Sequence, residues 1–250
     1  MRSVAEPRYA LVTGGSRGIG AAIVKRLAAE GFCVTFSYVS DEKAAIQVET
    51  DVRAAGGIAY RIRADLTDLD SVEQLADTIP NPALPHLDVV VNNAAIPTPV
   101  AMIEDTALET WSDNLMVAAT APFLIIKRAI PHLRPGAAII NISTINVGTQ
   151  PVAGVAAYAA GKGALEQLSA IAAVELGPRD ITVNTVRPGA TDTDMQRAAN
   201  PDPAVRAQIA EATPMRRLGQ PNDIADVVAF LAGPQGRWVT GQTISVSGGL

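Results

Sequence analysis

Tyr158 and Lys162 are the residues of this sequence whose types and spacing point most directly to chemistry. They lie four positions apart within a predicted helix over residues 155–176, so both side chains occupy one face. A free tyrosine titrates near pH 10, about three units too high for an efficient acid or base at neutral pH. A neighbouring ammonium favours the phenolate and lowers that pKa. The neighbours are Ala and Gly rather than polar surface residues, so the pair indicates proton transfer at an oxygen atom.

A glycine-rich turn is the second candidate for a functional site. Residues 13–20 read Thr-Gly-Gly-Ser-Arg-Gly-Ile-Gly and lie between a predicted strand and a predicted helix. Glycine lets the backbone approach a phosphate, and a helix N-terminus offers unpaired N–H groups at the positive end of the helix dipole. A plain turn would also explain a glycine cluster. Its position between the first strand and the first helix favours a dinucleotide site.

The end of the second predicted strand bears on which nicotinamide dinucleotide would bind. In this type of fold an acidic residue about 20 residues after the glycine turn holds the ribose 2′-hydroxyl of NAD. Here that place falls near Ser37 and Tyr38, which are neutral, and Asp41 comes several residues later. Arg17 supplies a cation for a 2′-phosphate, and either Ser40 or Lys43 would add hydrogen bonds. An ordinary exposed arginine is the alternative for Arg17. The sequence therefore favours NADP(H).

The elements that must position these residues alternate between strand and helix. Short apolar runs predict seven strands: Tyr9–Thr13, Cys33–Tyr38, Ile58–Ile62, Leu87–Val91, Ala137–Ile142, Ile181–Val186 and Thr243–Val246. The segments between them predict helices: Gly18–Glu30, Glu42–Ala55, Leu69–Thr78, Glu109–Leu133, Val155–Leu176 and Pro221–Leu231. Pro80–Pro85 is the best candidate linker, and a polar, partly helical insertion on the substrate side is expected near 190–214.

Repeated units of strand and helix predict parallel strands joined by right-handed crossovers. We therefore expect an α/β fold, with one doubly wound parallel sheet of about seven strands in three layers. This is a single Rossmann-type domain over residues 1–250, with ligands beyond the carboxyl ends of the strands.

Composition narrows the class of protein. The chain is 48% hydrophobic but only 4% aromatic, with 18% charged residues and a net charge of −5. A core of small aliphatic side chains fits these values, and no basic field favours nucleic acid or an anionic membrane surface. Cys33, the single cysteine, excludes an intrachain disulfide, and two histidines add too few ligands for a structural metal site. The sequence shows neither a signal-peptide pattern nor a membrane-spanning stretch, so we expect a cytoplasmic protein.

Taken in order, the motifs resemble those of the one-domain short-chain dehydrogenase/reductase family along the whole chain. The matching segments are the turn 13–20, Ala64-Asp65-Leu66, Val91–Ala95, the Tyr-x-x-x-Lys signature at 158–162, Pro188-Gly189 with Thr193, Arg217–Pro221 and Thr240–Gln242. Ala95 stands where glycine is usual. The resemblance is closest to β-ketoacyl-carrier-protein reductases and related ketoreductases. It implies a Rossmann fold and reduction of a ketone by hydride from NADPH.

The resemblance also implies roles for individual residues. Tyr158 would be the general acid/base, Lys162 would bind the nicotinamide ribose, Asp65 would contact adenine, and residues 188–193 would face the nicotinamide carboxamide. The full set implied for the cofactor is Gly14, Ser16, Arg17, Gly18, Ile19, Gly20, Tyr38, Ser40, Asp65, Leu66, Asn92, Ala94, Tyr158, Lys162, Pro188, Gly189, Thr191 and Thr193.

One departure from the family pattern concerns the hydroxyl that holds the substrate carbonyl. The family places a serine there, usually 13 residues before the tyrosine, but residue 145 is Ile. Aligning residues 139–144 with the family's strand puts Thr144 in that place, with one residue inserted in the following loop. Ser143 is the alternative, although the strand pleat would turn it to the opposite side. We assign Thr144 as the third catalytic residue.

A second departure lies in the helix after Trp111. The family's catalytic asparagine, which helps to hold a water that links the lysine to solvent, falls at Ala118. Ala118 keeps the backbone carbonyl that shares this role. Asn114, one turn earlier, either compensates or is an ordinary solvated or helix-capping residue. Two functions remain: an NADP-dependent carbonyl reductase, or an NADP(H)-binding protein with little or no turnover that acts as a sensor or assembly subunit.

The segments expected around the substrate carry apolar side chains and no arginine cluster. Residues 96–100, 145–155 and 190–213 fit an apolar small-molecule ketone or a β-ketoacyl group on a carrier protein. Lys127, Arg128 and Arg134 would meet an acidic carrier, or they serve only solubility. Small residues along 155–176 permit a close subunit contact, so a homotetramer is expected, as the resemblance implies. Packing within one chain is the alternative.

Overall fold

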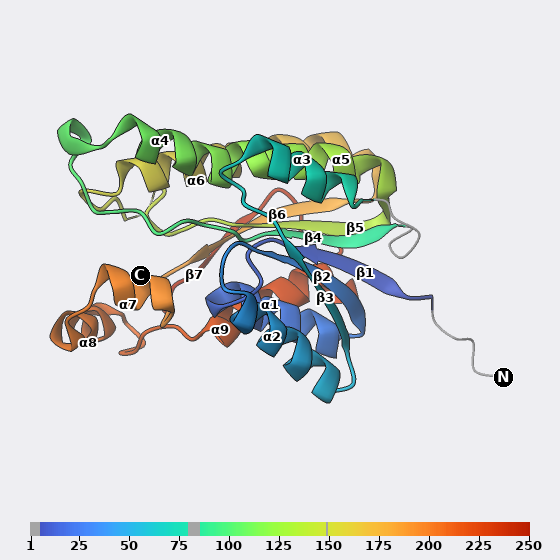
Figure 1. Cartoon of the computed structure of the whole chain (residues 1–250), viewed down its shortest axis with the longest axis horizontal. Coiled ribbons are helices and arrows are strands. Elements are labelled where there is room, and N and C mark those ends of the chain that lie inside the picture. The colour runs from blue at the N-terminus through green and yellow to red at the C-terminus, as the bar shows by residue number, and fades with distance from the viewer. Residues whose placement is uncertain (1–5, 80–85, 149) are drawn as a thin grey trace.

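Seven parallel strands form one sheet in the order β3-β2-β1-β4-β5-β6-β7 (Figure 1). The strands are β1 (Arg8–Val12), β2 (Phe32–Tyr38), β3 (Ile58–Arg63), β4 (Leu87–Asn92), β5 (Leu133–Ile142), β6 (Thr182–Pro188) and β7 (Thr243–Val246). The computed structural model describes residues 6–79, 86–148 and 150–250, so the predicted linker Pro80–Pro85 lies outside the described residues. The predicted doubly wound α/β class is confirmed.

Helices cover both faces of this sheet (Figure 1). One face carries α1 (Gly18–Ala29), α2 (Glu42–Ala54) and α9 (Pro221–Ala232). The other carries α3 (Leu69–Asp77), α4 (Leu108–Leu115), α5 (Ala121–Ala129) and α6 (Ala156–Leu176). The insertion near 190–214 forms α7 (Asp194–Ala199) and α8 (Pro203–Ala212), which lie apart from both layers at the left of Figure 1.

Neighbouring residues of the central strands feed two separate hydrophobic cores. Val12 and Ile140 pack with the α1, α2 and α9 side, whereas Leu11 and Ile139 pack with the α3, α5 and α6 side. Successive side chains of a strand point to opposite faces, so a strand covered on both faces must be apolar throughout. That requirement explains the apolar runs of the central strands, such as residues 9–12 and 89–91.

The helix predicted over Glu109–Leu133 is interrupted. After α4, the turn Met116–Thr120 (η2) is π-helical, α5 follows, and Ile130–His132 (η3) is a 3₁₀ turn. The predicted end at Leu133 is wrong because Leu133 already pairs with Leu87 of β4, and the register then shifts so that Val89 pairs with Ala138. A π turn inside a helix is rare and is frequently found at functional sites.

The stretch Leu108–His132 is long and apolar enough to span a membrane by length and composition alone. In the structure, however, α4 and η2 pack against α6, and α5 packs against α3. Ile125 and Ile126 are buried in the core beneath the sheet's α6 face. The apolar character of this stretch is therefore explained by packing within the fold.

Close approach of two helices sets the position of α6. A Cβ added at Gly161 would lie 2.8 Å from the Asn114 carbonyl oxygen and 3.0 Å from the Ala118 Cβ, closer than real Cβ contacts allow. Gly163, one residue beyond Lys162, has ordinary space, with the Val147 Cγ1 at 3.8 Å. The α4–η2 segment and α6 thus meet through small residues.

We predict that Gly161→Ala destabilises the protein by about 1–3 kcal/mol through overpacking. Gly163→Ala is the matched control and should stabilise it by about 0.5–1 kcal/mol, since alanine is the better helix former and meets no obstacle. Urea unfolding of both variants gives the two free energies. Equal effects of the two substitutions would contradict the close contact at Gly161.

Candidate active site

Three side chains predicted to be catalytic meet beyond the carboxyl end of β5. Tyr158 and Lys162 project from the first two turns of α6, and Thr144 follows the last residue of β5. The Thr144 side chain forms a hydrogen bond with the Tyr158 phenol. The structure therefore brings together a phenol, a hydroxyl and an amine from segments that are not adjacent in sequence.

Lys162 is a buried cation, with 2% of its surface exposed. Its Nζ donates to the carbonyl oxygen of Ile142 at 2.7 Å and to that of Ala94 at 3.5 Å. Ile142 is the last residue of β5, and Ala94 lies two residues beyond the end of β4. Burial lowers the pKa of Lys162 to about 8, because an apolar environment disfavours the charged form.

Two opposing effects act on the Tyr158 phenol. Burial raises its pKa, and the hydrogen bond with Thr144 lowers it by a smaller amount. The pKa of the phenol thus lies above its ordinary value in the protein without ligands. Tyr158 is accordingly protonated at neutral pH, the state required of a proton donor.

Thr144 and Ser143 were the two candidates for the substrate-holding hydroxyl, and their surroundings differ. The Ser143 Oγ donates to the Glu166 Oε1 at 2.5 Å, on the side of the sheet covered by α6. Thr144 instead faces Tyr158. These contacts favour Thr144 as the substrate-holding hydroxyl, in agreement with the prediction from the alternation of side chains along the strand.

Ala118 lies in the π turn and is buried, with its Cβ against Gly161. Asn114 is 2% exposed, so the expectation of a solvated residue is wrong. Its Oδ1 accepts from the Thr98 hydroxyl at 3.0 Å, and its amide donates to the Thr110 carbonyl at 2.8 Å. Asn114 thereby anchors the loop after β4, and neither of these bonds reaches Lys162.

The N-terminus of α1 is suited to an anion. Arg17 occupies the N-cap without a side-chain capping bond, and the first turn holds no acidic residue. By contrast, α2 and α3 are capped by the side chains of Asp41 and Asp68. An uncapped helix end leaves its first N–H groups and its positive dipole end available to a phosphate. The predicted Gly14, Ser16, Gly18, Ile19 and Gly20 all lie in this turn.

The glycine turn is braced by neighbouring strand ends. The Ser37 Oγ accepts from the Gly14 N–H at 3.1 Å, and Asn93 donates to the carbonyls of Thr13 and Gly14 at 2.9 and 3.1 Å. A Cβ at Gly20 would collide with the Gly14 carbonyl oxygen. The turn is thus held in one conformation before any ligand binds.

Two arginines flank the end of β2, where a 2′-phosphate would lie. Arg17 is exposed beside the glycine turn. Arg63, which the sequence reasoning missed, pairs in register with Tyr38, and its Nε donates to the Val39 carbonyl at 3.1 Å next to Ser40. Neither arginine forms an ion pair among the described residues. The pairing of Tyr38 with Arg63 places this arginine at the end of β2, and the register of two strands could not be predicted from the sequence.

Other predicted cofactor residues occupy different surroundings. The Tyr38 ring is buried, and its hydroxyl donates to Glu42 at 3.4 Å, so its side chain faces α2. Asp65 Oδ1 accepts from Thr67, which leaves Oδ2 without a partner in the described part of the chain. The Asn92 amide bonds to Asn141 inside the sheet. Leu66 is buried, and Ala94 contributes its carbonyl to Lys162.

The predicted nicotinamide-side segment follows β6 and crosses toward the glycine turn. Pro188 ends β6, the Gly189 N–H donates to Val246, and the Thr191 hydroxyl donates to the Gly189 carbonyl at 2.9 Å. Thr193 caps α7, and its Cγ2 lies 3.2 Å from where a Gly18 Cβ would be. Residues predicted to hold the pyrophosphate and the nicotinamide of one dinucleotide are therefore neighbours in space.

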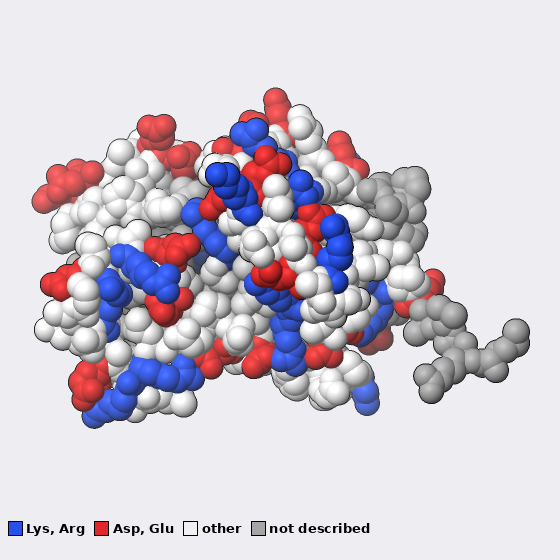
Figure 2. All heavy atoms as spheres, turned by 60° about the horizontal axis from the view of Figure 1, so that its bottom comes forward, with Lys and Arg blue, Asp and Glu red and all other residues white. Residues whose placement is uncertain are grey.

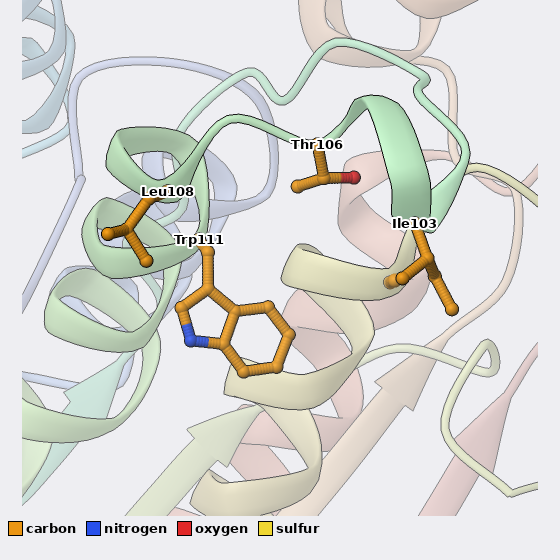
Figure 3. Close-up of a pocket in the computed structure, with 5 residues that line it drawn as sticks. Ile103, Thr106, Leu108 and Trp111 are labelled. Carbon is orange, nitrogen blue, oxygen red and sulfur yellow. The ribbon is translucent and has the colours of Figure 1, made fainter.

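An apolar pocket of about 440 Å³ lies beside the N-terminus of α6 (Figure 3). Its lining residues are Ile103, Thr106, Leu108, Trp111 and Ala156. Successive residues of a helix are about 100° apart, so Ala156 and Tyr158 point in nearly opposite directions. The pocket is thus on a different face of α6 from the catalytic pair.

Exposed charges of both signs are mixed on the surface. On the face shown in Figure 2, Lys and Arg side chains lie among Asp and Glu. Exposed ion pairs include Lys25–Asp51 and Arg217–Asp223. Within residues 6–79, 86–148 and 150–250, no group of three or more His, Cys, Asp or Glu side chains is placed to hold a metal ion.

Comparison with known proteins places this geometry in a family. A family model described as enoyl-(acyl carrier protein) reductase matches residues 14–250. The 3-oxoacyl-(acyl-carrier-protein) reductase FabG of Staphylococcus aureus is 37% identical over 245 residues, which cover 97% of this chain and 98% of that protein. A short-chain dehydrogenase/reductase structure from Serratia marcescens has a TM-score of 0.90 at 39% identity, covering 97% of each chain. The angucycline C-6 ketoreductase LanV, solved with bound NADP, has a TM-score of 0.90 at 35% identity over 97% of this chain and 95% of that one.

The fold and the phenol–amine pair define a Rossmann-type oxidoreductase. With these relatives, the chain belongs to the short-chain dehydrogenase/reductase family, as its motifs predicted. The uncapped α1 terminus and the two unpaired arginines fit a dinucleotide phosphate, and the relative solved with NADP supports a cofactor of the NADP type.

Burial of Lys162 predicts a pH dependence of stability. The unfolded lysine, with a pKa of 10.5, holds its proton above the folded pKa of about 8, so stability rises between these pH values. Lys162→Met removes this dependence. The difference in the free energy of unfolding between the wild type and this variant should therefore change by about 3 kcal/mol between pH 8 and pH 10.5. Urea unfolding at pH 7 to 10.5 measures it. Parallel curves for both proteins would show that Lys162 has an ordinary pKa.

Proposed function

We propose that the protein is an NADPH-dependent reductase that converts an apolar ketone to an alcohol, with Tyr158 as the general acid. The observation that carries this proposal is the Tyr158–Thr144 hydrogen bond above the buried Lys162. A protonated phenol and a hydroxyl can together bind one carbonyl oxygen. A purely structural tyrosine would not need a buried cation one turn away on the same helix face.

In this mechanism the chain's own groups manage the proton and the carbonyl. Thr144 holds the substrate oxygen, and Tyr158 transfers its proton to that oxygen as negative charge develops there. The Lys162 ammonium favours the resulting phenolate electrostatically. Lys162 would also hold the nicotinamide ribose, and the first turn of α1 the pyrophosphate. When bound, the reduced nicotinamide supplies the hydride to the carbonyl carbon.

The substrate class follows from the segments near this site. Val100, Val152 and Met195 are exposed apolar residues on three segments that bound the proposed substrate space, which includes the insertion near 190–214. A β-ketoacyl group or another apolar ketone fits them, and FabG relatives are named for carrier-bound oxoacyl substrates. Of the three cations proposed for an acidic carrier, Arg128 is paired with Asp77 at 3.1 Å and Arg134 with Asp88 at 2.8 Å. Free Cys33 fits a reducing cytoplasm.

Catalysis is tested with a panel of β-ketoesters, diketones and quinones under NADPH. We expect Tyr158→Phe to lower kcat about 10³-fold and Thr144→Val about 10²-fold, while Thr144→Ser keeps most activity. Ala118→Asn should change kcat less than Tyr158→Phe does, since the backbone carbonyl of the π turn is retained. Tight NADPH binding without turnover on any member would favour the alternative of a binding protein. A larger effect at Ala118 would overturn the assignment of roles.

Cofactor choice is tested by comparing NADPH with NADH. Arg17→Gln should raise the KM for NADPH roughly tenfold or more, because a charge-assisted hydrogen bond to phosphate is lost, and leave the KM for NADH nearly unchanged. Arg61→Gln is the control on β3, since Arg61 already pairs with Glu49. A wild-type preference for NADH would refute the choice of NADP(H).

A homotetramer is proposed from the outer face of α6. Ile171 and Val174 lie three residues apart there and are exposed, and Phe123 of α5 is exposed as well. Val174→Glu should lower the mass measured by size exclusion with light scattering, whereas Val205→Glu on α8 should not. A wild-type mass of a single chain would refute the assembly.

A further inference from the structure

A second charged cluster lies behind Thr144 and is not used in the mechanism above. The Glu166 carboxylate accepts from the Ser143 Oγ at 2.5 Å, from the Arg187 Nε at 2.7 Å and from the Arg187 Nη2 at 2.5 Å. The arginine and glutamate side chains are only 17% and 11% exposed. Ser143 is 3% exposed. One carboxylate thus holds three donors from two other segments in a mostly buried position.

The three residues come from the segments that carry the catalytic groups. Glu166 lies one turn beyond Lys162 on α6, Ser143 directly precedes Thr144, and Arg187 directly precedes Pro188 at the end of β6. The strand exits are also joined through their backbones: the Ser143 N–H donates to Val186 at 2.8 Å, and the Ile145 N–H to Pro188 at 3.2 Å. Glu166 is the member of the cluster that lies on α6. It contacts Ser143 just after β5 and Arg187 near the end of β6, and so joins the helix to both strand ends.

The chemistry of the cluster favours one rigid arrangement. A guanidinium presents its N–H groups as a planar fork, and two bonds to one carboxylate fix both orientation and distance. The hydrogen bond to Glu166 raises the pKa of Arg187 above its ordinary value, so the guanidinium remains charged. Arg187 also lies beneath the loop after Thr144, with its Nη2 3.6 Å from where a Gly148 Cβ would be.

The cluster constrains Thr144 through its neighbour. Ser143 is held by its side chain to Glu166 and by its backbone to Val186, so the peptide that leads into Thr144 has little freedom. The Thr144 side chain must meet Tyr158 and the substrate oxygen with correct geometry. A displacement of about 1 Å at such a group can lower the rate of reaction by a large factor.

We propose that Glu166 is a positioning residue that, through Ser143 and Arg187, fixes the Thr144 hydroxyl and the turn after β6 in their reactive places. This rests on the proposed function, in which Thr144 holds the carbonyl oxygen. The role is distinct from catalysis, since Glu166 contacts neither reacting group.

The test uses two serines of equal burial. Ser143→Ala removes the bond to Glu166, and Ser169→Ala is the control, because Ser169 is also 3% exposed and hydrogen-bonded, to Asn141 at 2.7 Å. We expect Ser143→Ala to lower kcat about tenfold or more, with the Kd for NADPH unchanged, whereas Ser169→Ala leaves kcat within about twofold. Equal kcat values for the two variants would mean that Ser143 and Glu166 have only a structural role, and would overturn the proposal.

The dependence on Thr144 is tested in double variants. If Ser143 acts through Thr144, then Ser143→Ala should have almost no further effect on kcat in a Thr144→Val background, so the two effects should not add. Additive losses would overturn the proposal. Glu166→Gln keeps an acceptor for Ser143 but removes the negative charge that pairs with Arg187, and it should lower kcat to a similar extent. Should Glu166→Gln fail to fold, the serine variants still decide the matter, because they leave the ion pair intact.

Failure of the proposed function would give a different result. If Thr144→Val alone leaves kcat unchanged, then Thr144 does not hold the carbonyl oxygen, and the proposed mechanism is wrong whatever Ser143→Ala does. If Thr144→Val lowers kcat but Ser143→Ala matches Ser169→Ala, the mechanism stands and only the positioning role is lost.

Discussion

The buried ammonium of Lys162 constrains the rest of the site. A charge inside a protein is tolerated only when its donors find acceptors, and the acceptors here are the carbonyls of Ile142 and Ala94 at the ends of neighbouring strands. Those carbonyls are free for Lys162 because the strands have just ended. The requirement ties α6 to the carboxyl edge of the sheet, and Tyr158, one turn earlier, is carried to the same edge.

Small residues make this approach possible. Gly161 and Ala118 let α6 lie against the α4–η2 segment at a distance that a larger side chain would prevent. This contact leaves no room for a larger side chain at Gly161. Ala118, which the motif order predicts in place of the family's asparagine, therefore also has a packing role. The π turn at Met116–Thr120 keeps an irregular backbone at that point.

Charge is distributed unequally between the two ends of the site. On the cofactor side, α1 alone among the first three helices lacks an acidic cap, and Arg17 and Arg63 stand without ion-pair partners in the described structure. On the substrate side, Arg187 is neutralised by Glu166. This distribution of charge supports the proposal that an anionic cofactor binds at the N-terminus of α1.

Local patterns were enough to predict much of this protein. The apolar runs predicted the bounds of all seven strands to within a few residues of those observed. They could do so because a strand covered on both faces is mostly apolar. The placement of Tyr158 and Lys162 on one helix face follows from helical spacing alone. What local patterns did not reveal are contacts between distant segments: the register that sets Arg63 beside Val39, the π turn before Ala118, and Glu166 between Ser143 and Arg187.

The sequence by itself determined the fold class, the dinucleotide turn and the phenol–amine pair, since each depends on residues close together in the chain. Only the tertiary structure shows that Thr144 faces Tyr158 while Ser143 faces Glu166, and only it places Asn114 in the interior. Those outcomes depend on which side chains from other elements fill the adjacent space, and hydrogen-bond partners such as Glu166 and Thr98 become neighbours only after the layers have packed.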